Sequence, residues 1–181
     1  AAVRYSRGSG VGVSLDEECR LLEVGKGEIL REGDHVALLA IGRTVGFSLQ
    51  AAEILSNEGI EATVANMRFA KPVDADLIRH LVRTVKRLIT IEDHTLYGGF
   101  GSAVLEILAD QGLLQNTRVL RLGIPDTFVP HGEPKRLLKL IGIDPDGIVE
   151  AARMFINNSG FHQHQPEIAR MTLDGEKTTT R

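Results

Sequence analysis

The stretch with the clearest potential for chemistry is Glu92-Asp93-His94, which follows an apolar run and precedes a loop that holds three glycines. Two carboxylates beside an imidazole could bind a metal ion or act as acid and base, because histidine titrates near neutral pH. Neighbouring residues of an extended chain point in opposite directions, however, so they converge on one ion only where the chain bends. The alternative is structural: Asp93 or Thr95 fixes the turn, and His94 contacts a neighbouring surface.

Three other histidines are isolated from further metal ligands. His131 lies between Pro130 and Gly132, where an imidazole more often makes a structural hydrogen bond than binds a metal. His162 and His164 lie in a polar C-terminal stretch with no third ligand nearby. Two histidines without further ligands do not make a metal site, so none is predicted.

The glycine-rich and nucleophile motifs in the chain are incomplete. The segment 8–12 has three glycines but lacks the Lys-Ser/Thr ending of a phosphate-binding loop, and it is interpreted as a linker. The segment 42–46 lacks the G-x-G-x-x-G spacing of a dinucleotide site. Neither Ser9 nor Ser102 lies in the G-x-S-x-G context of a hydrolase nucleophile. No catalytic residue is therefore predicted.

The composition limits the possible partners. The chain has 181 residues, of which 43% are hydrophobic and 25% charged, enough for one globular domain with its own core. Its formal net charge of -3 lacks the basic excess of nucleic-acid-binding domains. No apolar run approaches the roughly 18 residues of a membrane span, and the single cysteine, Cys19, excludes an intrachain disulfide. We expect neither nucleic acid nor a membrane as a partner.

The candidate residues must be positioned by strands and helices that alternate along the chain. Hydrophobic periodicity predicts strands at 21–30, 35–41, 60–67, 87–91 and 118–122 and helices at 44–58, 75–85, 100–111, 133–141 and 145–156. Thr44, Asp74 and Asp144 are the predicted N-caps.

The spacing of these elements predicts the fold class. Only a short turn separates the first two strands, so we expect them to form an antiparallel pair. The later strands and helices are joined by short loops, which implies right-handed crossovers. The fold is therefore predicted as α/β, with three αβα layers around a mostly parallel five-stranded sheet that has one antiparallel strand. The loop at 92–101 then lies at the carboxyl edge, where ligands or partners are usually met.

Several short motifs follow one another in a specific order. They are Arg4-Tyr5-Ser6-Arg7-Gly8, Gly25-Lys26-Gly27, Ala40-Ile41-Gly42, Arg68-Phe69-Ala70-Lys71-Pro72-Val73-Asp74, Glu92-Asp93-His94 with Gly98-Gly99-Phe100-Gly101-Ser102-Ala103-Val104, and Gly123-Ile124-Pro125-Asp126 through His131-Gly132. Together they resemble the C-terminal third of the 1-deoxy-D-xylulose-5-phosphate synthase family, within the transketolase superfamily. The resemblance divides the chain into the end of a preceding domain and a linker at 1–20, a transketolase C-terminal domain at 21–156, and a tail at 157–181 that we expect to be disordered.

Enzymes of this family use thiamine diphosphate and Mg²⁺ to decarboxylate pyruvate and to join the two-carbon unit to glyceraldehyde 3-phosphate, in isoprenoid precursor synthesis. Upstream domains hold the cofactor with a Gly-Asp-Gly motif, and this chain contains no Gly-Asp-Gly. The resemblance therefore implies a fragment that binds neither cofactor alone and is inactive by itself. Its implied partners are the missing N-terminal and central domains and a second subunit in a homodimer. The implied location is the bacterial cytoplasm or the plastid stroma.

The resemblance also implies a phosphate-binding role for Arg7. An arginine at this point of the linker helps to hold the sugar phosphate in the superfamily, and a guanidinium can bind two phosphate oxygens at once. Arg4 is the second candidate. Ser6 stands where the family has proline, which leaves the loop less constrained. A solvated surface arginine or an interdomain ion pair remains the alternative for Arg7.

Because the resemblance places the chemistry in the upstream domains, four residues are interpreted as interface residues: Glu92, Asp93, His94 and Phe100. Direct catalysis by the first three is the alternative. The glycines around Phe100 then form a tight turn between strand and helix, which allows close packing against neighbouring domains. The alternatives for the chain as a whole are the matching domain of a 2-oxo acid dehydrogenase E1 β subunit and a stand-alone assembly module without catalysis.

Overall fold

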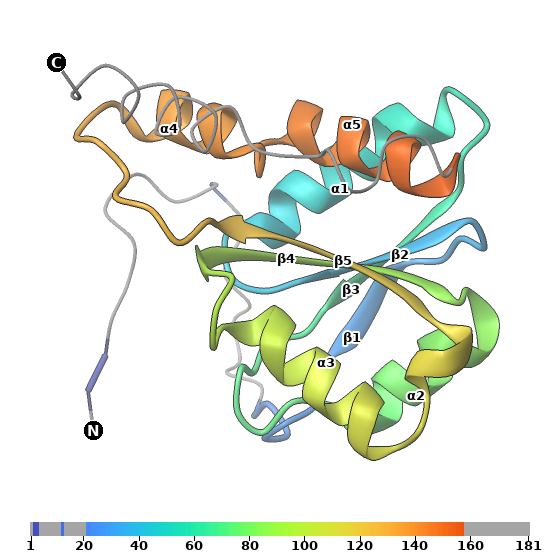
Figure 1. The fold of residues 1–181 in the computed structure, drawn as a ribbon. Helices are drawn as coiled ribbons and strands as arrows, with labels where there is room; N and C mark the ends of the chain where they lie inside the picture. Colours follow the sequence, from blue (N-terminus) through green and yellow to red (C-terminus); the bar gives the residue numbers. More distant parts are fainter. Residues whose placement is uncertain (1, 4–11, 13–20, 158–181) are drawn as a thin grey trace, which may run out of the picture.

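A five-stranded sheet separates two layers of helices in the computed structural model, which describes residues 2–3, 12 and 21–157 (Figure 1). The strands are β1 (Glu28–Arg31), β2 (Val36–Ala40), β3 (Ala62–Asn66), β4 (Arg87–Thr95) and β5 (Arg118–Ile124). The helices are α1 (Thr44–Ser56), α2 (Ala75–Thr84), α3 (Phe100–Asp110), α4 (Pro134–Ile141) and α5 (Pro145–Ile156), with a 3₁₀ turn, η1, at Leu114–Asn116. The predicted three-layer α/β fold is confirmed. The predictions for the N-terminal linker and the C-terminal tail, including His162 and His164, concern residues that lie almost entirely outside this description.

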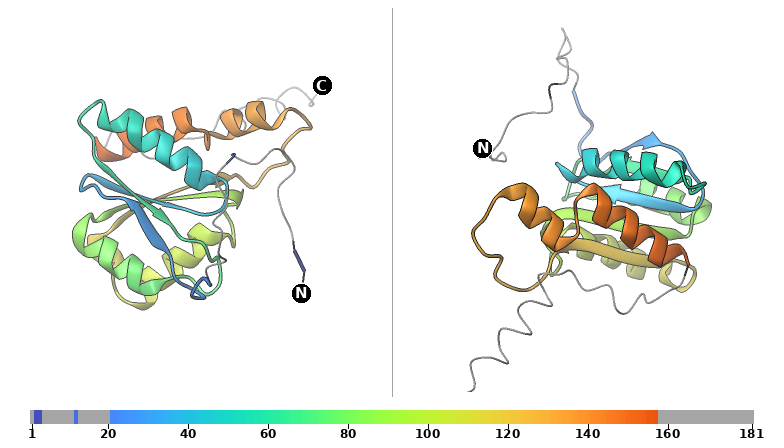
Figure 2. Two further views of the ribbon diagram at one scale, coloured as in Figure 1. Left: turned by 180° about the vertical axis from the view of Figure 1, so that it is seen from behind. Right: turned by 90° about the horizontal axis from the view of Figure 1, so that it is seen from above.

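The two helical layers cover opposite faces of the sheet (Figure 2). One layer contains α1, α4 and α5, and the other contains α2 and α3. The central strand β2 is completely buried, and its side chains alternate between the two cores: Leu38 belongs to the first and Leu39 to the second. This alternation follows from the two-residue period of a strand, and burial on both faces explains why the β2 segment is apolar throughout.

The strand order is β1-β3-β2-β4-β5, and only β1 is antiparallel to its neighbour. The expected antiparallel pairing between the strands at 21–30 and 35–41 is therefore wrong, because β3 lies between them. The chain passes the start of β3 at Gly33, whose N–H donates a 3.0 Å hydrogen bond to Thr63 Oγ1. A Cβ at Gly33 would lie 2.6 Å from the backbone of Ala62. Because the chain crosses β3 here, β2 lies on the other side of β3 from β1. It pairs in parallel with β3 along one edge and with β4 along the other.

The helix caps are confirmed at two of the three predicted positions. Asp74 accepts hydrogen bonds from the N–H groups of Asp76 and Leu77 at the start of α2, and Asp144 accepts one from Gly147 at the start of α5. Thr44 is not an N-cap, because it is the first residue of α1 and its hydroxyl makes no capping bond. That hydroxyl instead lies 3.0 Å from the carbonyl of Ile41 and 2.8 Å from that of Ile91, so it ties α1 to β4.

The strand predicted at 87–91 extends to Thr95. The extension is paired with β5: Thr95 lies opposite Ile124, and the Leu96 N–H donates to the Ile124 carbonyl at 2.9 Å. The register shifts between Ile91 and Thr95, so the end of β4 is irregular. No described helix is long and apolar enough to cross a membrane.

Candidate functional site

The described residues enclose a groove of about 1000 Å³ at the carboxyl edge of the sheet. Its walls come from the loops after β2, β3 and β4 and from one side of α3, and they include Ile41, Arg43, Lys71, Asp93, His94 and Ile107. The chain proceeds from β2 to β3 on one side and then crosses to β4 on the other, so the groove lies at the point where the direction of the strand order reverses. Open α/β sheets usually bind ligands or partners at this point.

Glu92 is buried beneath the groove, with 1% of its surface exposed. Its carboxylate accepts hydrogen bonds from the N–H groups of Phe100 at 2.6 Å and Gly101 at 2.8 Å, the first two residues of α3. The first N–H groups of a helix have no partner inside the helix and lie at the positive end of its dipole. Glu92 therefore caps α3 from the preceding strand, a role that the sequence analysis missed because the two segments are eight residues apart.

The cap also explains the glycines that follow β4. A Cβ at Gly99 would overlap both the Thr95 carbonyl oxygen and the Glu92 carboxylate. A Cβ at Gly101 would lie 2.5 Å from the Thr90 hydroxyl. The absent side chain at Gly99 thus lets the Glu92 carboxylate reach the helix terminus, and the absent side chain at Gly101 lets the first turn of α3 lie against Thr90 and Arg121. Both glycines are required by close approach rather than by a ligand.

The three residues of Glu92-Asp93-His94 do not converge. Glu92 points inward, whereas Asp93 and His94 are exposed at the groove. The Asp93 carboxylate lies 3.3 Å from Arg43 Nη1, and the Arg43 guanidinium lies 5.8 Å from the centre of the Phe47 ring. Within the described part of the chain, no group of three or more His, Cys, Asp or Glu side chains could hold a metal ion. These residues therefore do not fit Mg²⁺.

The loop between β4 and α3 is fastened by a second set of contacts. Arg121 Nη1 on β5 donates to the Leu96 carbonyl at 2.7 Å and to Ser102 Oγ at 3.0 Å. Ser102 Oγ also donates to the Leu96 carbonyl, and it accepts from the Gly98 N–H. Tyr97, between the anchored positions, is left with 68% of its surface exposed.

A second aromatic residue is exposed at the same edge. Phe128, in the loop after β5, is 99% exposed. Neither Tyr97 nor Phe128 was predicted as a site residue, although each lies close to turn-forming glycine or proline residues that predict a loop. An aromatic residue in such a loop is the signal that could have identified them.

The predicted site residues differ in where the structure places them. Arg4 and Arg7 lie outside the described residues. Phe100 is buried against the α2–α3 layer of the sheet, as part of the core. The isolated domain therefore already surrounds Glu92 and Phe100, whereas Asp93 and His94 remain accessible. The interface role of these four residues stays a prediction.

The sequence matches one family model, "Transketolase, C-terminal domain", over residues 25–148. Among curated proteins, it is 53% identical to 1-deoxy-D-xylulose-5-phosphate synthase 1 of Geobacter metallireducens. The match extends over 156 residues and covers 86% of this chain and 25% of the relative. The corresponding enzyme of Desulforudis audaxviator is 48% identical over 151 residues, covering 83% of this chain and 24% of that protein. The chain thus spans about a quarter of the length of these relatives.

Solved structures give the same fold. A protein described as a split gene transketolase, inactive beta4 tetramer, has a TM-score of 0.69 and 33% identity, covering 75% of this chain and 44% of the other. A transketolase variant from Pichia stipitis has a TM-score of 0.53 at 16% identity, covering 78% of this chain and 19% of the other, a similarity of fold alone.

Proposed function

Because this chain belongs to the transketolase C-terminal domain family, we propose that it is the C-terminal part of a 1-deoxy-D-xylulose-5-phosphate synthase. Such an enzyme condenses pyruvate with glyceraldehyde 3-phosphate and releases CO₂. The observation that carries the proposal is the 53% identity to a synthase of this name over 156 residues. Other synthases at 43–50% identity support it, and they favour it over an E1 β subunit or a stand-alone module.

The proposed role of this part is structural support for the active site. Thiamine diphosphate and Mg²⁺ would be bound by the upstream domains of the parent enzyme. Two observations support this division: the described residues include no metal-binding cluster, and the Glu92 carboxylate is already occupied by the start of α3. The described inactive state of the split-gene neighbour, of which this chain covers 44%, is consistent with an active site that needs further domains.

Arg7, with Arg4 as a second contact, is proposed to hold the phosphate of glyceraldehyde 3-phosphate. The proposal rests on the motif Arg4-Tyr5-Ser6-Arg7-Gly8 and on the geometry of guanidinium, which donates two parallel hydrogen bonds to phosphate. The partners proposed are the N-terminal and central domains of the same polypeptide and a second subunit in a homodimer. The bacterial sources of the relatives favour the bacterial cytoplasm over the plastid stroma.

An activity measurement tests this function directly. Purified chain 1–181 and the full-length polypeptide that contains it would each be incubated with pyruvate, glyceraldehyde 3-phosphate, thiamine diphosphate and Mg²⁺, and the product would be detected by mass spectrometry. We expect product from the full-length protein alone. Product from chain 1–181 would refute the proposal that the upstream domains are needed for activity. A full-length protein that folds and binds thiamine diphosphate but forms no product would refute the synthase assignment.

A further inference from the structure

We propose that the carboxyl edge of the sheet, anchored by Tyr97 and Phe128, is the surface on which the polypeptide upstream of residue 21 docks in the parent enzyme. This inference rests on the proposed function, since it requires upstream domains. It moves the expected contact away from Glu92 and Phe100, which are buried within the domain itself. We call the surface formed by Tyr97, Phe128 and the adjacent groove the docking edge.

The two anchors are the exposed aromatic side chains among the described residues. They extend from neighbouring strands, because β4 and β5 pair up to their ends through the 2.9 Å hydrogen bond from Leu96 N–H to the Ile124 carbonyl. Tyr97 follows this bond directly, and Phe128 lies four residues beyond Ile124. Aromatic residues are enriched among the residues that dominate protein interfaces.

The Tyr97 loop is held in place before any partner arrives. Glu92 fixes its far end through Phe100 and Gly101, and Arg121 fixes its near end through Leu96. A loop that is already ordered loses little conformational entropy when it binds, so more of its contact energy contributes to association. Rigid display of an exposed aromatic ring is typical of a binding anchor.

The path of the chain identifies the occupant of this surface. Because β1 is antiparallel, its first residue, Glu28, pairs with Asn66 at the carboxyl end of β3. The turn before β1 contacts the same edge, since a Cβ at Gly25 would lie 2.8 Å from Pro72 in the loop after β3. The segment just before β1 therefore lies at the carboxyl edge of the sheet, the edge at which β4 and β5 lead into Tyr97 and Phe128.

The residues at the point of entry are apolar and exposed. They are Leu21, Leu22 and Val24. They lie just before β1, whose first residue pairs with the carboxyl end of β3. In a C-terminal domain the rest of the enzyme precedes this point, so the upstream domains are tethered next to the docking edge, which raises their effective concentration there.

Hydrogen exchange of the full-length enzyme and of chain 1–181 tests the proposal. We expect amides in peptides covering 95–99 and 125–131 to exchange at least about tenfold more slowly in the full-length protein, because docking removes their access to solvent. The control peptide covers 112–117 at the opposite edge, where Leu114 is also exposed, and its exchange should be unchanged. Equal exchange of the two anchor peptides in both proteins would overturn the proposal.

Matched variants of the full-length enzyme separate docking from folding. The double variant Tyr97→Ser, Phe128→Ser should lose the protection of 95–99 and 125–131, whereas Leu114→Ser should keep it. Retained protection in the double variant would exclude the two rings as anchors. If chain 1–181 alone shows concentration-dependent protection of these peptides, with a dimer by light scattering, the edge binds a second copy and the proposal is wrong. Product formation by the wild-type full-length enzyme tests the proposed function separately.

Discussion

The carboxylate of Glu92 lies 2.6 Å from the backbone nitrogen of Phe100, the first residue of α3. Through this contact, Glu92 near the end of β4 caps the following helix, α3. The contact explains how an acidic residue is buried at the carboxyl edge without a basic partner among the described residues: the otherwise unpaired N–H groups and the dipole of α3 take that place. The contact also shapes the loop that displays Tyr97.

Removing this cap should destabilise the domain. Glu92→Ala leaves the N–H groups of Phe100 and Gly101 buried without their acceptor, so we expect a loss of about 2–3 kcal/mol in the free energy of unfolding. Glu92→Gln keeps one acceptor oxygen and should lose about 1 kcal/mol. Urea unfolding of chain 1–181 measures both. The control is Glu106→Ala, an exposed position on α3, where we expect a change within about 0.5 kcal/mol. Equal effects at the two glutamates would contradict the capping role.

The close approach at Gly99 gives a second prediction. Gly99→Ala would place a methyl group against the Thr95 carbonyl and the Glu92 carboxylate, so we expect a destabilisation of about 1–3 kcal/mol. Its φ of -84° suits alanine, so the loss would come from overlap rather than backbone strain. The matched control is Gly46→Ala in α1, where a Cβ meets open space and should stabilise the helix by up to about 1 kcal/mol. A neutral or stabilising Gly99→Ala in thermal unfolding would refute the packing argument.

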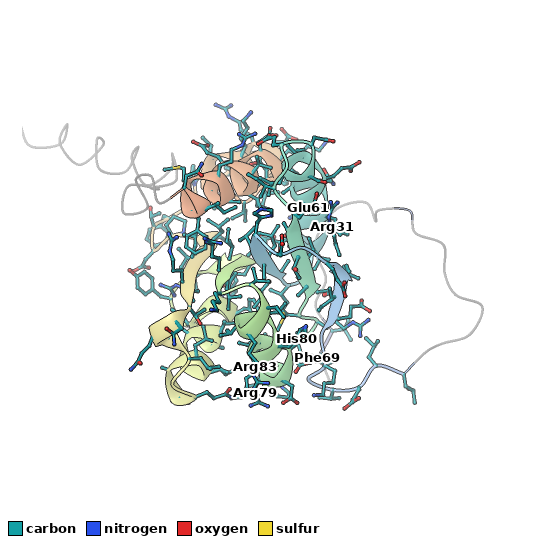
Figure 3. The ribbon with its side chains drawn as sticks, turned by 90° about the vertical axis from the view of Figure 1, so that its right-hand side faces the viewer. Arg31, Glu61, Phe69, Arg79, His80 and Arg83 are labelled. Carbon is teal, nitrogen blue, oxygen red and sulfur yellow. The ribbon has the colours of Figure 1, made fainter. Side chains whose placement is uncertain are left out.

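The ion pair between Arg31 and Glu61 links β1 to the start of β3 and predicts a pH dependence (Figure 3). Hydrogen bonds from Ser56 and then Arg31 hold the pKa of the Glu61 carboxyl below its ordinary value of 4.5. A carboxyl with a lowered pKa in the folded state stabilises it above the ordinary pKa and loses that contribution as pH falls through the folded-state pKa. Glu61→Gln should therefore be less stable than wild type at pH 7, and the difference should shrink below pH 4.5.

Unfolding curves of the two proteins at several pH values check this expectation. The control is Glu53→Gln, an exposed position on α1, measured at the same pH values. A difference between wild type and Glu61→Gln that stays constant, or grows, as the pH falls would show that the carboxylate is not stabilised by these contacts.

Substrate kinetics test the proposed role of Arg7. In the full-length enzyme, Arg7→Ala should raise the apparent KM for glyceraldehyde 3-phosphate far more than that for pyruvate, because pyruvate has no phosphate. A charge-assisted contact of this kind contributes about 1.5–3 kcal/mol. Arg7→Lys keeps the charge but not the two parallel hydrogen bonds, so it should fall between Arg7→Ala and wild type. Equal increases in the two KM values would rule out the phosphate contact.

The parts of the fold that depend on local patterns were predicted correctly from the sequence. The apolar run at 35–41 predicts β2, and the structure buries it completely. Asp74 and Asp144 act as the predicted caps, because a cap bonds to N–H groups two or three residues further along the same chain. The three-layer fold follows from the alternation of such elements, since a crossover between parallel strands requires a helix to cover the sheet.

The errors in strand pairing and in the Thr44 cap involve partners that are distant along the chain. The sequence could not show that β3 separates β1 from β2, because Thr63 and Gly33 meet only when the sheet forms. Thr44 is a residue type that commonly caps helices, yet its hydroxyl donates a hydrogen bond to the carbonyl of Ile91 on β4.

For the candidate site, the sequence determined the residue types at the carboxyl edge, and the tertiary structure decided their roles. The sequence left Glu92-Asp93-His94 as interface residues or, alternatively, catalytic ones, and the fold places the start of α3 on the Glu92 carboxylate. Tyr97 and Phe128 read as ordinary loop residues until their exposure is seen. The physical reason is the same in each case: capping and burial depend on which surfaces meet when the chain folds, whereas periodicity and turn preference depend only on neighbours along the backbone.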